Sequence, residues 1–177
     1  GRTPIATGGG GDSADAVLQE ASAAAEAVTS FHFRLTHENG STPLPMNLVK
    51  DFVGAGHRDL GKVQAMVKEY PNLVHSKYDW GSGDFESAIE GAGHVGNKAI
   101  AEFLIESGSR VSLFQLTMLG RTDLVKPWLE AYPKLIFANG PHGFTLLHHA
   151  KVGGPAGKDL YDYLLEKGLK EDKVKIK

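Results

Sequence analysis

Three stretches of the sequence share one pattern and decide the fold: AGHRDLGKVQAMVKEYPNLV from Ala55, AGHVGNKAIAEFLIESGSRV from Ala92, and TMLGRTDLVKPWLEAYPKLI from Thr117. Each begins with a turn and continues with apolar residues at i, i+3 and i+4, the spacing of one helix face. A fourth copy starts at Thr145 and ends at Gly168, a residue typical of a helix C-cap. The repetition predicts helix pairs that stack and together bury a continuous apolar strip.

The apolar positions of the four copies are the expected core, and Trp128 is expected to be buried with them. They are Val63, Met66 and Val67, then Ala101, Leu104 and Ile105, then Val125, Trp128 and Leu129, and finally Tyr161, Leu164 and Leu165.

The repeats carry a family resemblance. TLLHHAKVGG at 145–154 resembles the ankyrin signature T-P-L-H-x-A and the Gly that follows it, and SAIEGAGHVGNKAIAEFLIESG at 87–108 resembles the rest of the unit. Residues 51–58 and 85–96 are also similar to a group of small bacterial ankyrin-repeat proteins. The resemblance implies an all-α solenoid of about four irregular helix-turn-helix units over 48–170.

This sequence departs from the family pattern in composition and spacing. Leu146 stands where the family has Pro, and Glu90 and Phe114 replace the signature His. The second and third copies are closer together than a unit of about 33 residues, whereas the other steps are longer. We therefore expect the finger loop before Leu113 to be almost absent, and the loops at 78–85 and 138–144 to be expanded.

The N-terminal region has a different character. Residues 1–13 predict a flexible tether of the kind that follows a removed export signal, and 14–47 predict a helix (14–29) and a half-buried strand (31–35). Residues 13–45 resemble the opening helix and strand of mycobacterial lipid-carrying lipoproteins. At the other end, the charged tail 171–177 predicts a solvated, frayed terminus.

Composition excludes several classes of protein. The 177 residues have a formal net charge of −2, which gives no reason to expect a nucleic acid partner. No apolar run is long enough to cross a membrane, so a soluble chain is expected, either cytoplasmic or exported with its signal removed. There is no cysteine, which rules out disulfides and thiolate chemistry.

Histidines are the residues that invite a catalytic interpretation. His142, His148 and His149 lie close together in the sequence and could bind a metal with Asp159. The competing interpretation is structural: His148 takes the signature position and bonds to a neighbouring turn, and His149 is exposed. Adjacent helix residues point in different directions, which favours the structural interpretation. We therefore expect no metal, no cofactor and no catalytic residue.

His57 and His94 occupy equivalent Gly-His positions in two copies. An active site is normally built once, whereas a structural residue recurs with the repeat. We therefore interpret both histidines as structural.

The expected function is non-catalytic binding of an unidentified protein partner through finger loops that project to the same side. Trp80 has two interpretations, an aromatic anchor for the partner or a cap on the hydrophobic strip. The residues expected to contact the partner are Asp79, Trp80, Asp84 and Phe85 in the first long loop, and Asn139, His142 and Phe144 in the last.

Two alternative functions remain open from the sequence. One is a metal-dependent enzyme that uses the cluster of His142, His148 and His149. The other is an envelope-anchored, lipid-handling fragment, which follows from the resemblance of the N-terminal region. If the strand at 31–35 is exchanged between chains, we expect a homodimer.

Overall fold

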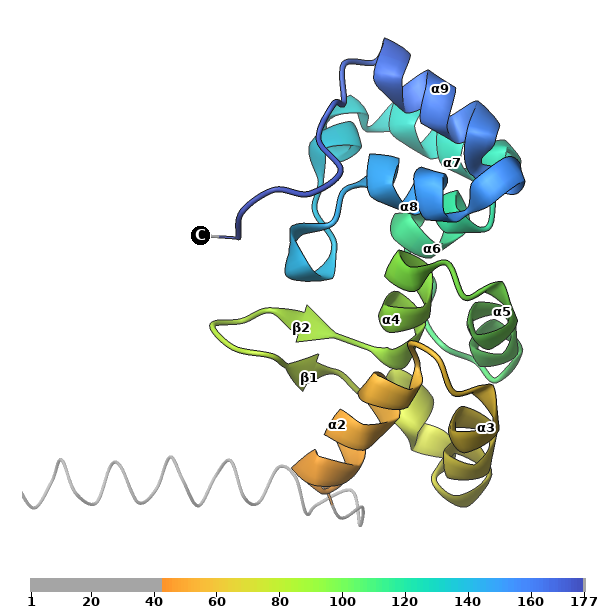
Figure 1. The fold of residues 1–177 in the computed structure, drawn as a ribbon, viewed down its shortest axis with the longest axis vertical. Coiled ribbons are helices and arrows are strands. Elements are labelled where there is room, and N and C mark those ends of the chain that lie inside the picture. The colour runs from red at the N-terminus through yellow and green to blue at the C-terminus, as the bar shows by residue number, and fades with distance from the viewer. Residues whose placement is uncertain (1–42, 177) are drawn as a thin grey trace, which may run out of the picture. The chain divides into compact units, whose positions relative to one another are not determined.

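The computed structural model describes residues 43–176, and Figure 1 shows that this part is built from consecutive helix pairs. It contains eight α-helices: α2 (Met46–Ala55) with α3 (Leu60–Glu69), α4 (Ala88–Val95) with α5 (Lys98–Glu106), α6 (Leu113–Met118) with α7 (Thr122–Ala131), and α8 (Leu146–Val152) with α9 (Lys158–Glu166). The prediction of a mostly helical fold is confirmed for this part. The helix predicted over 14–29 and the strand over 31–35 lie outside the described residues.

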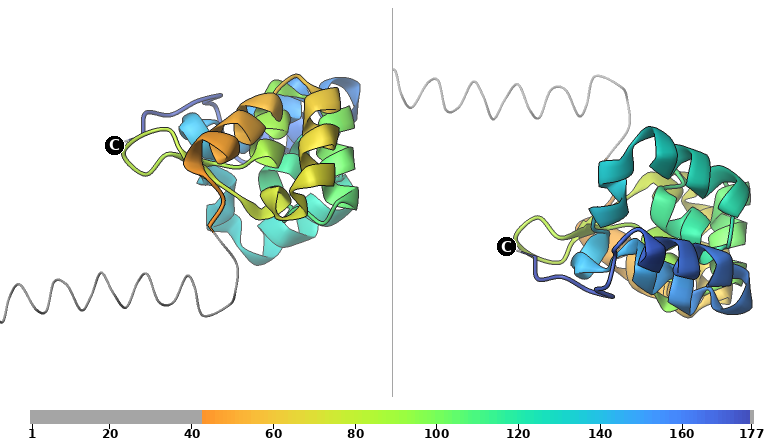
Figure 2. Two further views of the ribbon diagram at one scale, coloured as in Figure 1. Left: turned by 90° about the horizontal axis from the view of Figure 1, so that it is seen from below. Right: turned by 90° about the horizontal axis from the view of Figure 1, so that it is seen from above.

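The two connections predicted to be long contain the non-helical structure. The first holds an antiparallel hairpin, in which Tyr78 lies opposite Glu86. The connection before α6 is only six residues, 107–112. The short elements are η1 (Pro71–His75), β1 (Tyr78–Asp79), β2 (Phe85–Glu86), η2 (Pro133–Phe137), η3 (Pro141–Gly143) and η4 (Gly154–Gly157). In Figures 1 and 2 the hairpin, η3 and the C-terminal segment all lie on the same side of the helices.

In three of the helix pairs, a Ser or Thr residue caps the start of the first helix. The backbone N–H of Ser87 donates to the Glu90 carboxylate at 2.8 Å, and that of Ser112 donates to Gln115 Oε1 at 3.0 Å. Both are capping boxes, and Thr145 caps α8 with its side chain. These local signals fix where α4, α6 and α8 begin, and hence the position of every side chain that they carry.

The first helices of the pairs form the inner layer of the fold. Helix α4 packs against α2 on one side and against α6 on the other, and α6 packs against α8. Helix α8 also contacts α4 directly. In a strictly linear array each unit touches only its neighbours, so this junction of three helices is a departure from such an array.

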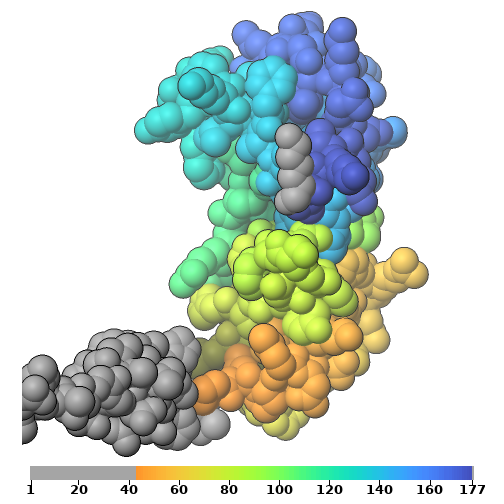
Figure 3. All heavy atoms as spheres, turned by 90° about the vertical axis from the view of Figure 1, so that its left-hand side faces the viewer, coloured from red at the N-terminus to blue at the C-terminus, as the bar shows by residue number. Residues whose placement is uncertain are grey.

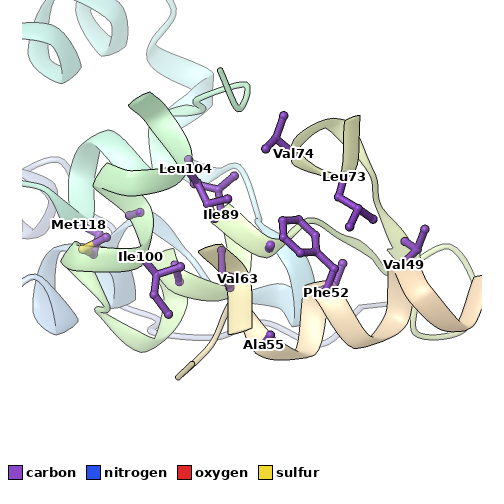
Figure 4. Packing of buried hydrophobic residues seen from close by; sticks show 14 residues of the cluster. Val49, Phe52, Ala55, Val63, Leu73, Val74, Ile89, Ile100, Leu104 and Met118 are labelled. Carbon is purple, nitrogen blue, oxygen red and sulfur yellow. The ribbon is translucent and has the colours of Figure 1, made fainter. Parts of the chain in front are cut away.

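The apolar core has two parts. Figure 4 shows the first, which joins the first two pairs and ends at Met118 of α6. The second lies within the last two pairs. Of the expected core residues, those at 1% exposure or less are Val63, Ala101, Leu104, Val125, Leu129 and Leu164.

The prediction that Trp128 is buried was wrong, because its side chain is 41% exposed. Val125 and Leu129 are the residues of α7 that point inward, and Trp128 lies at the edge of the face that they bury. Leu165, also 41% exposed, occupies a similar edge on α9.

The C-terminal segment is paired with the loop before α8, so the prediction of a frayed tail was wrong for these residues. Lys173 forms an antiparallel bridge with Phe144, and the Val174 N–H donates to the Gly143 carbonyl at 2.9 Å. The Thr145 hydroxyl donates to the Glu171 carbonyl at 2.6 Å. The tail therefore holds the last long loop in place.

The turn after α4 should not tolerate a side chain. Gly96 has φ of +75°, and a Cβ there would lie 2.5 Å from the Val152 carbonyl oxygen. Gly108, at φ +90°, has open space around it. Gly108→Ala should therefore lower the free energy of unfolding only by the cost of a left-handed alanine, about 1–2 kcal/mol. Gly96→Ala should lower it by about 1–3 kcal/mol more, because its Cβ also meets the Val152 carbonyl oxygen.

Urea unfolding of the two variants and the parent protein measures this difference. Equal losses in the two variants would show that α4 and α8 are not in contact at this point.

Candidate functional site

A fully buried carboxylate, that of Glu86, organises the polar centre of the molecule. Its Oε2 accepts a hydrogen bond from Trp80 Nε1 at 2.7 Å, and its Oε1 lies 2.7 Å from His94 Nε2. His57 Nε2 is 3.5 Å from Oε1, and His142 Nε2 is 3.4 Å from Oε2. One indole and three imidazoles therefore converge on one carboxylate, which we call the Glu86 cluster (Trp80, Glu86, His57, His94 and His142).

Each member of the Glu86 cluster comes from a different element. Glu86 ends β2, His94 lies in the last turn of α4, and His57 lies in the turn between α2 and α3. His57 can reach the carboxylate because residue 91 is glycine: a Cβ there would lie 2.8 Å from its ring. The stacking of the first two pairs thus brings two equivalent Gly-His turns together, with His57 Nε2 at 3.1 Å from His94 Nε2.

Asp84 fixes the third imidazole of the cluster, that of His142. Its Oδ1 accepts from the His142 backbone N–H at 2.8 Å, and its Oδ2 lies 2.6 Å from His142 Nδ1. His142 has φ of +58°, a left-handed conformation that is uncommon for a residue other than glycine. The two contacts stabilise this conformation, and they join the hairpin to the loop before α8. Figure 3 shows the hairpin, in yellow-green, packed against the rest of the protein from that side.

The charge of Glu86 is set by its neighbours. Burial would raise the pKa of the Glu86 carboxyl, but His57 and His94 outweigh burial and lower its pKa well below the usual range. The contact with Glu86 raises the pKa of His57, and burial offsets only part of that rise. Glu86 is therefore ionised at neutral pH, and its negative charge must be balanced from within the cluster.

The residues expected to contact a partner fall into three groups. Asp84, Trp80 and His142 belong to the network around Glu86. Phe144 is also drawn inward: its ring stacks on His94 and His148, with centroid distances of 4.9 and 4.2 Å. Asp79 is a turn residue, because its Oδ1 accepts from the backbone N–H groups of Gly81 and Gly83, at 2.8 and 3.1 Å.

Phe85 and Asn139 form the third group, because they line a groove of about 640 Å³ between the hairpin and the loop before α8. The side chain of Phe85 is 53% exposed. The other residues along the groove are Lys77, Gly83, Asp84, Glu90, Gly140, Pro141, Lys175 and Ile176. The two long loops thus border one groove.

Trp80 shows features of both a partner-binding anchor and a residue that packs against the fold. Its side chain is 40% exposed, its indole N–H is bonded to Glu86, and its ring lies edge-on to Tyr78 at 4.9 Å. It is therefore a surface aromatic residue that is held by a buried charge.

The three histidines His142, His148 and His149 do not share a ligand position. His148 Nε2 donates to the His94 carbonyl at 2.8 Å, as a signature histidine that bonds to a neighbouring turn would. His149 was expected to be exposed, but it is fully buried and its Nδ1 donates to the Thr145 carbonyl at 2.7 Å. Helix α8 turns the two rings toward different sides, at 83° to one another.

Sequence reasoning missed Glu86 altogether and interpreted His57 and His94 as structural. A signal was present in the repeated Ala-Gly-His at 55–57 and 92–94. Equivalent residues of adjacent repeats lie side by side in a stack, so a repeated histidine is also a way to make a pair of imidazoles. Within residues 43–176, the one group of three side chains whose ligand atoms could share an ion is His57, Glu86 and His94.

Comparison with models of protein families, with curated proteins and with solved structures found no match to this chain. Among the helices of residues 43–176, none has the length and apolar character that crossing a bilayer requires.

The bond between Trp80 and Glu86 should contribute measurably to stability. Trp80→Phe removes the indole N–H and leaves a buried carboxylate oxygen with one donor fewer, so the free energy of unfolding should fall by about 1–3 kcal/mol. Trp128→Phe is the matched control, since Trp128 is equally exposed and its indole makes no hydrogen bond within residues 43–176. Its change should stay within about 0.5 kcal/mol. The free energies of unfolding are measured in urea. Equal losses in Trp80→Phe and Trp128→Phe would show that the bond between Trp80 and Glu86 does not contribute to stability.

His149 should make the fold sensitive to acid. Burial lowers the pKa of its imidazole to about 4, and the bond to the Thr145 carbonyl only partly opposes this. Because the unfolded chain takes up this proton near pH 6.5 and the folded chain does so only near pH 4, the contribution of neutral His149 is complete above pH 6.5 and is lost as pH falls.

Between pH 7.5 and 5, the free energy of unfolding of the parent protein should fall by about 2 kcal/mol more than that of His149→Gln. The exposed His75 supplies the control, and His75→Gln should follow the parent curve. A parent curve that coincides with that of His149→Gln would show that His149 is not buried in the neutral form.

Proposed function

We propose that residues 48–170 are an ankyrin-type repeat module that binds a protein partner without catalysis, and that the partner enters the groove between the hairpin and the loop before α8. The observation that carries the proposal is the exposure of Phe85 on the wall of that groove. Large exposed apolar side chains in a concave surface are typical of binding sites rather than of ordinary solvated surface.

The repeat interpretation is supported by features that recur at equivalent positions. Gly96 and Gly120 follow the first helices of two pairs and have φ of +75° and +74°. Gly108 and Gly168 follow the second helices of two pairs, at +90° and +93°. Thr145 of the signature-like stretch caps α8, as the signature Thr would. The contact between α4 and α8 is the feature that a regular ankyrin stack would not contain.

The chemistry of the groove favours an extended peptide with an apolar anchor. Phe85 and the exposed Ile176 supply apolar area on two sides. Lys77, which is paired with Glu90 at 2.9 Å, and Lys175 supply charges at its border. An apolar centre with a polar rim is the usual composition of a protein interface.

The network around Glu86 would support binding indirectly. Asp84 and His142 tie together the two segments that border the groove, so its width is held before a partner arrives. A site that is organised in advance loses less conformational entropy on binding.

The proposal is tested with peptides selected from a random display library on the full chain, with affinities measured by isothermal titration. Phe85→Ala should weaken binding of a selected peptide at least tenfold, the loss expected of a central aromatic anchor. Tyr132→Ala, which removes a 63% exposed aromatic ring that is not part of the groove lining, should change affinity less than twofold.

Two results would contradict the proposed function. One is a selection that yields no peptide although the chain is folded by circular dichroism. The other is a set of peptides whose binding is unchanged by Phe85→Ala.

A further inference from the structure

Three ligand atoms in the Glu86 cluster lie close to the separations that one metal ion imposes. His94 Nε2 is 2.7 Å from Glu86 Oε1, the two Nε2 atoms of His57 and His94 are 3.1 Å apart, and His57 Nε2 is 3.5 Å from Oε1. Ligands at about 2.1 Å from a common ion are ~3.0–3.4 Å apart in octahedral or tetrahedral geometry. The separation between the two Nε2 atoms lies within this range, the one between His94 Nε2 and Glu86 Oε1 is shorter, and the one between His57 Nε2 and Oε1 is slightly longer.

The hydrogen bonds of a neutral His57 ring leave no hydrogen to face the negative charge of Glu86. His57 Nδ1 lies 3.1 Å from the Val53 carbonyl, an acceptor, so Nδ1 carries the hydrogen and Nε2 of a neutral ring is a lone pair. That lone pair faces the ionised oxygen of Glu86. His94 has one hydrogen at Nε2 and uses it at 2.7 Å on Glu86. A proton on His57, or a cation between the three groups, makes the contact between His57 and Glu86 attractive.

The surroundings of the three groups resemble the outer shell of a metal site. Ligating histidines donate their other ring nitrogen to a carbonyl or carboxylate, as His57 does to Val53. Ligating carboxylates are in turn hydrogen-bonded, as Glu86 is by Trp80. His142, whose Nδ1 is held by Asp84, directs a third imidazole nitrogen toward the same carboxylate.

We propose that His57, Glu86 and His94 bind a divalent first-row transition-metal ion of the Zn²⁺ class. Two imidazoles and one carboxylate suit such ions and not Ca²⁺ or Mg²⁺, which need more oxygen ligands. Binding displaces the hydrogen of His94 from Nε2, and the ring then carries its hydrogen on Nδ1. The side chains of His57 and His94 are 20% and 10% exposed, so the ion is reached from solvent on the His57 side.

Three protein ligands leave at least one coordination position for water or for an outside ligand. An outside ligand would approach past His57 and not past Glu86, whose side chain has no exposure. The inference does not depend on peptide binding, because the ligands of the ion are not those that line the groove.

The test is isothermal titration of the full chain with Zn²⁺ after removal of bound metal by a chelator, with Co²⁺ as the spectroscopic probe. We expect one ion per chain and a Co²⁺ spectrum with nitrogen and oxygen ligands. His57→Gln should weaken binding at least a hundredfold, and Trp80→Phe, which acts through Glu86, tenfold to a hundredfold. The exposed His75 provides the control, and His75→Gln should bind like the parent protein.

A second measurement needs no variant, in case His57→Gln does not fold. In the ¹⁵N-labelled parent protein, Zn²⁺ should shift the Nε2 resonances of His57 and His94 and leave those of His75 and His149 in place. The proposal is overturned if the folded parent protein binds neither Zn²⁺ nor Co²⁺. It is equally overturned if the ring resonances that shift are those of other histidines. Peptide binding that survives either result would leave the proposed function intact.

Discussion

The arrangement of the polar centre depends on one constraint: the ionised carboxylate of Glu86 has no contact with water and must be compensated by protein groups. No single element offers enough donors. The carboxylate is satisfied only when the hairpin supplies Trp80, the turn after α2 supplies His57, and α4 supplies His94. His142 adds a contact from a loop more than fifty residues away in the chain. Burial of one charge therefore requires four segments to be in place together.

The helix pairs could be predicted from the sequence because their signals are local. Apolar residues at helical spacing, the caps Ser87, Ser112 and Thr145, and the glycines that end helices act within a few residues of their own position. The junction of α4, α6 and α8 could not be predicted, because it depends on how three helices fill one volume. The pairing of the tail was missed although the alternation of Lys173, Val174, Lys175 and Ile176 is typical of an edge strand.

The candidate site was predicted only in its loops. Aromatic and acidic residues in 78–85 and 138–144 stood out by composition, and the structure brings Asp84 and His142 into contact. Glu86 carries no local signal, since a single acid at the end of a short strand is ordinary. The meaning of His57 and His94 lies in the stacking, which places equivalent residues of neighbouring pairs next to each other. A repeated residue can therefore be a ligand pair as well as a structural motif.

Native-state hydrogen exchange of Glu86→Gln measures whether Glu86 holds the hairpin and the loop before α8 in their positions. The exposed Glu102 serves as control in Glu102→Gln. We predict that Glu86→Gln accelerates exchange at the backbone amides of Trp80, Phe85 and His142 and leaves the amides of α5 and α9 unchanged, whereas Glu102→Gln alters neither set. Unchanged protection of the hairpin and loop amides in Glu86→Gln would show that Glu86 does not hold these two segments in place.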